Sequence, residues 1–280
     1  MAVSPEGRPE VVLEADRSRP SAFTLVVSGT EQSYVDLDDP GRIEFDYVQR
    51  MADVLDLHLS RPRDDEEARR VVHVGGAGLS LPRFVASRHT RTPQVVLEPD
   101  TVLTGFVREH LPLPPRSGIK VRDVAGRPGL EAMRDDFADV VVLDAFDGAQ
   151  VPPDLTTAEC VATVRRVLTS DGLFLLNLTD TAPFAYVRRV VATLGRSFSH
   201  VGLSAEPATL KGRRFGNVLA VASGEALPVE EMTRVAARSM FPYRVMGPAD
   251  VRRTFHGGAV LTDADPQHSP APPGGPGVFR

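Results

Sequence analysis

The sequence predicts an α/β protein with a doubly wound, mostly parallel sheet and a short N-terminal β-hairpin subdomain. Three observations lead to this prediction. From Val71 onward, strand-like and helix-like segments alternate, which is typical of βα units in a parallel sheet. The run DVVVL, from Asp139 to Leu143, is apolar on both faces, as a central strand covered by helices on both sides must be. A glycine-rich turn, GGAG at 75–78, ends the first strand and opens a helix, an arrangement typical of nucleoside-binding units.

The elements follow from hydrophobic spacing and turn residues. We expect residues 1–20 to be loose, because they are polar and interrupted by prolines. Strand-like runs at 23–28 and 32–37, joined by Gly29-Thr30, predict a hairpin, and apolar residues at helical spacing predict a helix over 46–59. The charged run at 60–70 predicts a solvated loop. Further strands are predicted at 71–74, 94–98, 119–123, 138–144, 172–178, 200–204 and 215–222. Further helices are predicted at 79–89, 100–110, 128–135, 155–168, 183–194 and 228–239.

The end of the chain departs from this alternation. The strand at 215–222 follows another strand with only a loop between, so we expect it to pair antiparallel at the sheet edge. After Pro248 apolar residues become sparse, and the last stretch, SPAPPGGPGVFR, has no means of packing a core. We therefore divide the chain into a loose N-terminal segment, a small β subdomain with a linking helix, a Rossmann-like catalytic domain and a C-terminal extension, at 1–20, 21–60, 61–245 and 246–280.

Composition narrows the classes of function. The chain has 280 residues and a net charge of −5, which gives no reason to expect nucleic acid or an anionic membrane as a partner. Its one cysteine, Cys160, excludes an internal disulfide and is compatible with a reducing compartment. No apolar run approaches the roughly 18 to 20 residues that span a bilayer, and the N-terminus lacks the apolar core of a signal peptide. We expect a cytoplasmic protein.

Metal and hydrolase chemistry find no motif. The seven histidines form no HxxxH or HxH pair, and no cysteine spacing suits zinc, so we expect no metal. Neither a GxSxG elbow nor a GxxxxGK[ST] loop is present. His73, inside the first strand of the alternating region, is expected to be buried and hydrogen-bonded.

The first group of candidate residues suits a nucleoside. Gly75, Gly76 and Gly78 let the backbone come close to a ligand at a helix N-terminus. Glu98, at the tip of the second strand, can accept both hydroxyls of a ribose. Asp123, at the end of the third strand, is either a partner for the amine of an adenine or a cap for the helix near 128. These residue types predict a nucleoside site at the carboxyl end of the sheet.

The second group follows the fourth and fifth strands. Asp144 and Asp147 leave the strand at 138–144 three residues apart. Asp144 is the better candidate for a general base, and Asp147 lies further out, where it could bind a cationic group. The alternative is turn and capping chemistry in a DG sequence. Asn177 and Asp180 either line the same mouth or end their strand.

With these residues in view, the chain resembles the spermidine synthase (polyamine aminopropyltransferase) family, which has the methyltransferase-type Rossmann fold. The resemblance extends from about Tyr34 to Ala222. It rests on EFDY at 44–47, the glycine turn at 75–78, Glu98 with Asp100, Asp123, the pair Asp144 and Asp147, and Asp171-Gly172.

This resemblance implies roles for the candidate residues. Glu98 would hold the ribose and Asp123 the adenine of decarboxylated S-adenosylmethionine. Asp144 would deprotonate an attacking small-molecule amine, while Asp147 and Tyr47 would help seat it. The resemblance also implies a homodimer.

Three departures from the family pattern leave the transferred group open. Gly78 stands where the family has an acid that balances the ammonium of the donor, a contact worth about 1.5–3 kcal/mol. Val48 follows Tyr47 where the family has glutamine, and Gly148-Ala149-Gln150 replaces a proline step. Aminopropyl transfer, methyl transfer from S-adenosylmethionine itself, and nucleoside binding without catalysis therefore all stand as hypotheses. A pocket with fewer acids should also favour an acceptor less cationic than a polyamine.

Overall fold

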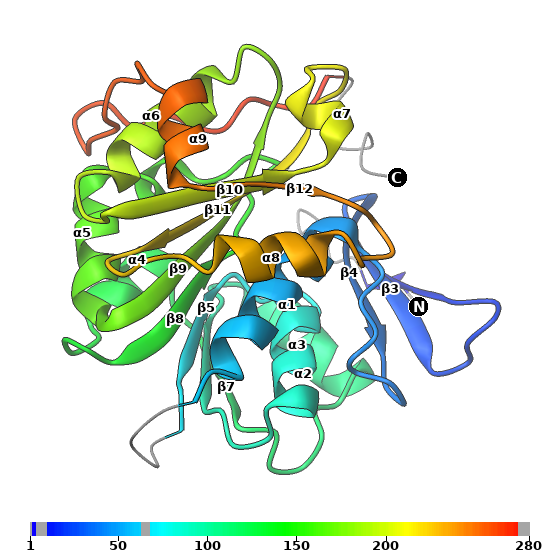
Figure 1. Cartoon of the computed structure of the whole chain (residues 1–280). Helices are drawn as coiled ribbons and strands as arrows, with labels where there is room; N and C mark the ends of the chain where they lie inside the picture. Colours follow the sequence, from blue (N-terminus) through cyan, green and yellow to red (C-terminus); the bar gives the residue numbers. More distant parts are fainter. Residues whose placement is uncertain (1, 4–9, 63–67, 274–280) are drawn as a thin grey trace.

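The computed structural model describes residues 2–3, 10–62 and 68–273, which form two β-sheets and the helices that flank them (Figure 1). The run at 63–67 and the tail beyond residue 273 lie outside the described residues. The strands are β1 (Ala2–Val3), β2 (Val11–Ala15), β3 (Ala22–Val27), β4 (Thr30–Asp36), β5 (Val71–Val74), β6 (Gln94–Leu97), β7 (Ile119–Arg122), β8 (Ala138–Leu143), β9 (Leu168–Asp180), β10 (His200–Ala205), β11 (Gly216–Ser223) and β12 (Arg244–Met246).

The helices cover both faces of the larger sheet. They are α1 (Asp46–Leu59), α2 (Ser80–Arg88), α3 (Thr101–His110), α4 (Gly126–Glu131), the 3₁₀ helix η1 (Pro153–Leu155), α5 (Ala158–Val167), α6 (Ala185–Leu194), α7 (Pro207–Leu210), α8 (Val229–Ala236) and α9 (Pro248–Thr254). Side chains of α4, α5, α6 and α9 share one buried cluster with the sheet, and those of α1, α2 and α8 share another. Along β8, Val141 and Leu143 belong to the first cluster and Val140 and Val142 to the second, as the doubly apolar run predicted.

The larger sheet has the order β12-β10-β11-β9-β8-β5-β6-β7, and β7, β6, β5, β8 and β9 run parallel. This confirms the predicted doubly wound α/β class. The expectation that the strand near 215–222 forms the sheet edge is wrong, because β11 pairs antiparallel with both β9 and β10. Every residue of β11 except Asn217 is buried, so an interior position removes its apolar side chains and its backbone from water. The short β12 takes that edge instead.

The N-terminal sheet has the order β1-β2-β3-β4. The predicted hairpin is present as β3 and β4. The expectation of a loose segment up to residue 20 is wrong for β2, which pairs with β3 over five positions. Val11 of β2 and Leu25 of β3 are buried against α3 in a third apolar cluster. This burial stabilises β2 despite the polar residues around it. Figure 1 shows this sheet beside the α1–α3 side of the molecule.

The C-terminal region is more ordered than expected. The proposed domain boundary at 245/246 falls inside β12, and α9 packs against β10. The expectation that the last stretch cannot pack is wrong for its described part, because Ser269 and Pro272 are buried. Polar contacts hold this segment: Arg127 forms an ion pair with Asp263 at 2.6 Å, and the Val151 N–H donates to Ser269 Oγ at 2.9 Å. These contacts carry no hydrophobic periodicity, so they left no signal of the kind that predicts helices and strands.

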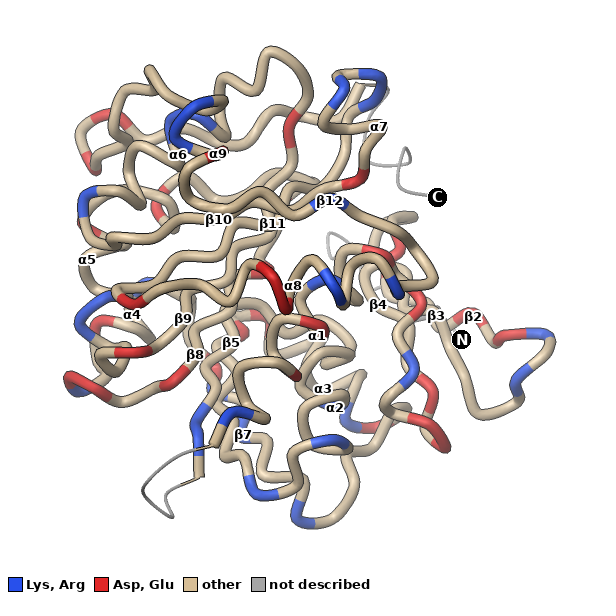
Figure 2. The backbone as a smooth tube through the Cα atoms, viewed as in Figure 1, with Lys and Arg blue, Asp and Glu red and all other residues tan. Residues whose placement is uncertain are grey.

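Charged residues of both signs are interspersed along the described backbone (Figure 2). The longest helix, α1, has 14 residues, and no helix in the described residues is long and apolar enough to cross a membrane.

Candidate active site

The predicted polar residues lie in one row across the carboxyl ends of neighbouring parallel strands. In the ladder, Leu97 of β6 pairs with Arg122 of β7, so Glu98 and Asp123 follow side by side. In the same way Val74 of β5 pairs with Leu143 of β8, so Gly75 and Asp144 are neighbours. Leu143 also pairs with Leu176 of β9, so Asp144 lies next to Asn177. The structure therefore brings the row together as the strand order requires.

The glycine turn is shaped by the backbone of the next strand. Gly75 has φ +94°, and a Cβ there would lie 2.3 Å from the carbonyl oxygen of Asp144, so only glycine fits. The Gly76 N–H donates to Glu98 Oε2 at 2.9 Å, and the Asp100 N–H donates to Glu98 Oε1 at 2.9 Å. Each carboxylate oxygen can still accept one further hydrogen bond. Glu98 therefore braces the turn and keeps acceptor capacity for two hydroxyl groups.

Gly78 meets the N-terminal sheet. Its N–H donates to Ser33 Oγ at 3.0 Å, and a Cβ at this position would lie 2.7 Å from the Ser33 Cβ. Ser33 of β4 thus occupies the space that a side chain at position 78 would need. The end of the turn where the resembling family has a carboxylate is lined here by a hydroxyl and by backbone.

Asp144 stands at the centre of the row and is held by a chain of amides. Asn177, which is 1% exposed, donates from Nδ2 to Asp144 Oδ1 at 2.9 Å, and Asn217 donates from Nδ2 to Asn177 Oδ1 at 3.0 Å. Burial raises the pKa of Asp144 to about 6, and the hydrogen bond from Asn177 opposes that rise. Near neutral pH the carboxylate is ionised and oriented, and it is more basic than an exposed aspartate.

Two cavities open on this region and share three of their lining residues. A small one of about 60 Å³ is lined by the glycine turn and Asp144. A larger one of about 580 Å³ lies beyond it and is lined by Asn177 and Asn217. Gln32, Tyr47 and Phe146 line both. Asp144 therefore lines the small cavity, and its hydrogen-bond partner Asn177 lines the larger one.

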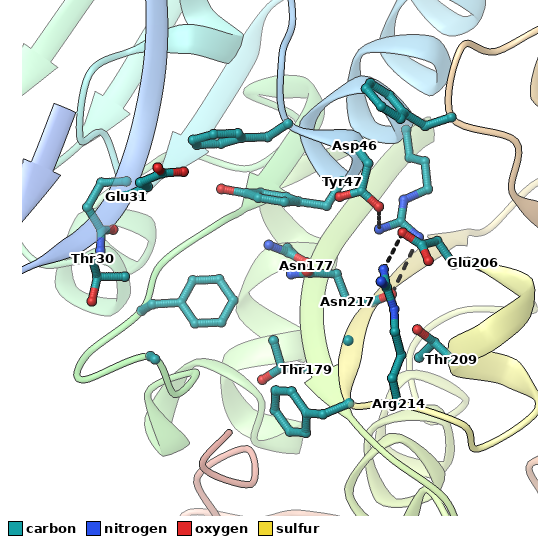
Figure 3. A pocket seen from close by; sticks show the side chains of 18 of the residues that line it. Thr30, Glu31, Asp46, Tyr47, Asn177, Thr179, Glu206, Thr209, Arg214 and Asn217 are labelled. Atoms are coloured by element: carbon teal, nitrogen blue, oxygen red, sulfur yellow. Dashed lines mark hydrogen bonds and ion pairs between the residues drawn. The ribbon is translucent and has the colours of Figure 1, made fainter. Parts of the chain in front are cut away.

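Tyr47 lies in the wall between the two cavities. It is the second residue of α1, and Figure 3 shows its ring above Asn177. Burial, the charge of Asp144 and the charge of Asp46 raise its pKa well above the usual value. The phenol therefore stays protonated and can donate a hydrogen bond to a ligand.

The far side of the larger cavity carries charges of both signs. Arg50 is 2% exposed and lies 3.5 Å from Asp46, while Arg214 pairs with Glu206 at 2.5 Å. Figure 3 shows Asp46, Glu206 and Arg214 grouped on one side of the cavity, opposite Thr30 and Glu31. Burial, followed by the hydrogen bond with Asp46, raises the pKa of Glu206. The cavity thus contains a cluster of two arginines and two acids, which we call the four-charge cluster (Asp46, Arg50, Glu206, Arg214).

Other predicted residues have separate outcomes. Asp123 is exposed, and Ala125 is the N-cap of α4, so the capping alternative for Asp123 is wrong. Asp147 is exposed and lines neither cavity; its backbone N–H bonds to the carbonyl of Gln150 in a turn. Asp180 caps the start of α6 by accepting from the Val187 N–H at 2.9 Å. His73 is buried and bonded to Gln94 at 2.9 Å, as predicted.

Sequence reasoning missed the four-charge cluster and Asn217. One signal was present: Arg50 lies three residues after Tyr47 and next to Met51, on the buried stripe of α1, where a charged side chain is out of place. Glu206 and Arg214 lie on the connection between β10 and β11, and their neighbours in sequence give no comparable sign. Among the described residues, no group of three or more His, Cys, Asp or Glu side chains is arranged to hold a metal ion.

Comparison with known proteins places this geometry among related folds. No family model matches the chain. A polyamine aminopropyltransferase of Vibrio vulnificus is 27% identical over 179 residues, which cover 61% of this chain and 56% of that protein. The matched region thus spans little more than half the length of this curated relative. A probable spermidine synthase from Corynebacterium glutamicum superimposes with a TM-score of 0.86 and 26% identity, covering 94% of this chain and 96% of the other.

More distant structures share the fold. A spermidine synthase in complex with the transition state analogue AdoDATO has a TM-score of 0.59 and 16% identity, over 86% of this chain and 77% of the other. Human methyltransferase-like protein 13, in complex with SAH, has a TM-score of 0.53 and 18% identity, over 76% of this chain and 93% of the other. These comparisons confirm the resemblance: the chain has homologues that are polyamine aminopropyltransferases and structural neighbours that are spermidine synthases, on a methyltransferase-like fold.

Proposed function

We propose that this chain is a spermidine synthase-like transferase that moves an aminopropyl group from decarboxylated S-adenosylmethionine to a small-molecule amine and releases methylthioadenosine. The observation that supports this most directly is the position of Asp144. It lines the glycine-turn cavity, is oriented by a hydrogen bond from Asn177, which lines the larger cavity, and has a pKa raised to about 6. A base between a donor chamber and an acceptor chamber is what amine alkylation requires.

The row of strand ends would hold the nucleoside part of the donor. Glu98 retains two acceptor positions for the ribose hydroxyls while its other two are used by backbone N–H groups. Asp123, one strand further along, would accept the adenine amine. Gly75 and Gly76 would let the sulfonium end lie close to the turn. The three strand spacings from β7 to β8 span about 14 Å, which is room for a nucleoside along the row.

The reaction balances with the residues present. The lone pair of a neutral amine forms a bond to the carbon next to the sulfonium, and the C–S bond breaks with its electron pair going to sulfur. The donor leaves as a neutral thioether, methylthioadenosine. Before this attack the acceptor's ammonium gives a proton to Asp144, which is ionised near neutral pH, and the secondary ammonium formed by the attack carries the positive charge lost by the sulfonium. Tyr47 would donate a hydrogen bond that helps to place the acceptor. For Asp147, a role in seating the acceptor would require a movement of its turn toward the larger cavity.

A second reaction is supported by one specific contact. Ser33 fills the space beside Gly78 where the resembling family carries an acid for the donor ammonium. S-adenosylmethionine carries its own carboxylate beside its ammonium, so it depends less on an acid from the protein at this position. Methyl transfer from S-adenosylmethionine is therefore the alternative. A third possibility is a binding protein of the same fold without catalysis. The resemblance also extends the proposal to a homodimer, which sedimentation velocity tests.

Product analysis separates these possibilities. The protein is incubated with an amine and either donor, and the nucleoside product is identified by mass spectrometry. Methylthioadenosine supports aminopropyl transfer, and S-adenosylhomocysteine supports methyl transfer. The variant Asp144→Asn should lower the rate about 10²- to 10⁴-fold, the usual contribution of a general base. If neither product forms, and neither donor raises the melting temperature, the assignment of the row as a nucleoside site is wrong.

A further inference from the structure

Arg50 is a buried cation whose bonds in the protein are incomplete. Its two contacts, to Asp46 Oδ2 at 3.5 Å and to the carbonyl oxygen of Asn217 at 3.4 Å, are both long. Its Nε–H has no hydrogen-bond partner among the described residues, although the side chain is 2% exposed. A guanidinium has five N–H donors, and burying them without partners is unfavourable. Because Arg50 lines the larger cavity, a ligand there can accept from the terminal guanidinium N–H groups, which otherwise have only these two long contacts.

Arg214 gives the same cavity a second positive charge that suits an anion. It also lines the cavity, and its side chain is 56% exposed, so it can turn toward a ligand without leaving a buried site. It closes a basic stretch after α7 that also contains Lys211 and Arg213, seen as a blue segment near α7 in Figure 2. Two guanidinium groups at one side of a cavity match a carboxylate, whose two oxygens accept from planar N–H pairs.

The same side of the cavity also offers acceptors for an ammonium group. Asp46 and Glu206 stand beside the two arginines, and the four formal charges cancel. Figure 3 shows Glu206 between Asp46 and Arg214. A cluster that presents both signs complements a group that itself carries both signs. The α-ammonium and α-carboxylate of an amino acid are such a group.

The strand order gives the distance between Asp144 and the four-charge cluster. Asp144 follows β8, Asn177 lies on β9, and Asn217, whose carbonyl contacts Arg50, lies on β11, the next strand. Two interstrand spacings give about 10 Å between the backbone positions at the two ends. An acceptor that reaches both must have its reactive amine and its charged head several bonds apart.

We propose that the acceptor is a diamino acid, with its terminal amine at Asp144, its α-carboxylate on Arg50 and Arg214, and its α-ammonium on Asp46 and Glu206. This inference rests on the proposed function and names the acceptor class for the same site. A simple diamine would leave the guanidinium of Arg50 with only its two long contacts, to Asp46 and to the carbonyl of Asn217. Loss of that charge-assisted contact should weaken binding about tenfold or more.

Two pairs of probes isolate the carboxylate. L-Ornithine differs from putrescine, and L-lysine from cadaverine, by one carboxylate group. Calorimetric titration in the presence of methylthioadenosine should show that each amino acid binds at least tenfold more tightly than its diamine. The variant Arg214→Gln should lose most of that preference, and because it frees Glu206 from its ion pair the diamines should bind no more weakly than before. Arg234→Gln, on the outer face of α8 with a side chain 67% exposed, is the matched control and should keep the preference.

A folding defect is separated by a second variant. Arg50→Met replaces a buried charged side chain and can disturb folding, so Arg50→Lys is measured as well. Lysine keeps the charge but not the planar pair of N–H donors. In Arg50→Lys the preference for amino acids over diamines should therefore fall while the protein stays folded. Equal or tighter binding of the diamines by the unaltered protein would overturn the inference. Methylthioadenosine release with putrescine but not with ornithine would overturn it while leaving the proposed function intact. The binding titrations need no turnover, so a failure of transfer with preserved ornithine preference would instead count against the proposed function.

Discussion

Replacing Asp144 by asparagine should make the protein more stable near neutral pH while removing its activity. Burial raises the pKa of this carboxyl from 3.8 to about 6. At 1.36 kcal/mol per pKa unit, the difference corresponds to up to about 3 kcal/mol, because the folded protein holds a carboxylate that it solvates less well than water does. Asparagine has no charge to bury, and its Oδ1 can still accept the hydrogen bond from Asn177.

The sign of the effect follows from proton linkage. Below pH 3.8 the carboxyl is protonated in both the folded and the unfolded state, so the charge costs nothing there. Between about 4 and 6 the folded state binds more protons than the unfolded state, and the stability of the unaltered protein therefore falls as pH rises. Above about 6 the carboxyl is ionised in both states, and the full cost is present. The advantage of Asp144→Asn should grow across this window and then stay constant.

Denaturant unfolding of both proteins at several pH values from 4.5 to 8 measures this difference. Asp147→Asn, an exposed change on the same loop, serves as the control and should show no comparable growth. A variant that is no more stable at pH 8 than at pH 4.5, relative to the unaltered protein, would contradict the assignment of Asp144 as a partly buried carboxylate with a raised pKa. Unchanged product formation by the variant would contradict its role as the base.

Three further changes probe the row and the turn. Asn177→Ala removes the hydrogen bond to the ionised form of Asp144, so the acidic limb of the pH–rate profile should move upward by about one to two pH units. Gly78→Asp should destabilise the protein by about 1–3 kcal/mol because its Cβ meets Ser33 at 2.7 Å; adding Ser33→Gly should recover the stability in denaturant unfolding and raise affinity for the decarboxylated donor about tenfold. Glu98→Gln should weaken methylthioadenosine binding about tenfold or more in calorimetry, and an unchanged affinity would refute the ribose assignment.

The strand-end residues could be predicted because their positions follow from local sequence. Each parallel strand is a short apolar run, and the residue after it must lie at the same edge of the sheet as the others. Glu98 and Asp144 could therefore be predicted without knowing the strand order, whereas Asn177 lies inside β9, three residues before its end. The pairing of β11 could not be found this way, since an apolar run reads alike at an edge and inside a sheet.

The cluster in the larger cavity depends on contacts between distant parts of the chain. Arg50 and Asn217 are 167 residues apart, and no spacing rule connects a helix near the N-terminus with strand β11. The contact of Ser33 with Gly78 joins the small sheet to the glycine turn in the same way. Both are tertiary contacts, and local sequence propensity does not determine them.

Two features of the site act on charge in the same direction. At the donor end, a hydroxyl of Ser33 lies beside Gly78 in place of an acid. At the acceptor end, Arg50 and Arg214 offset Asp46 and Glu206. A site for two polycations gains from acids at both ends, because attraction between unlike charges is strong where water is partly excluded. Here the glycine turn has a hydroxyl beside it and the four-charge cluster has no net charge, so substrates that carry a carboxylate should be tolerated at either end. Donors and acceptors that differ by a single carboxylate should therefore differ in affinity, and this difference should rank the substrates of the protein.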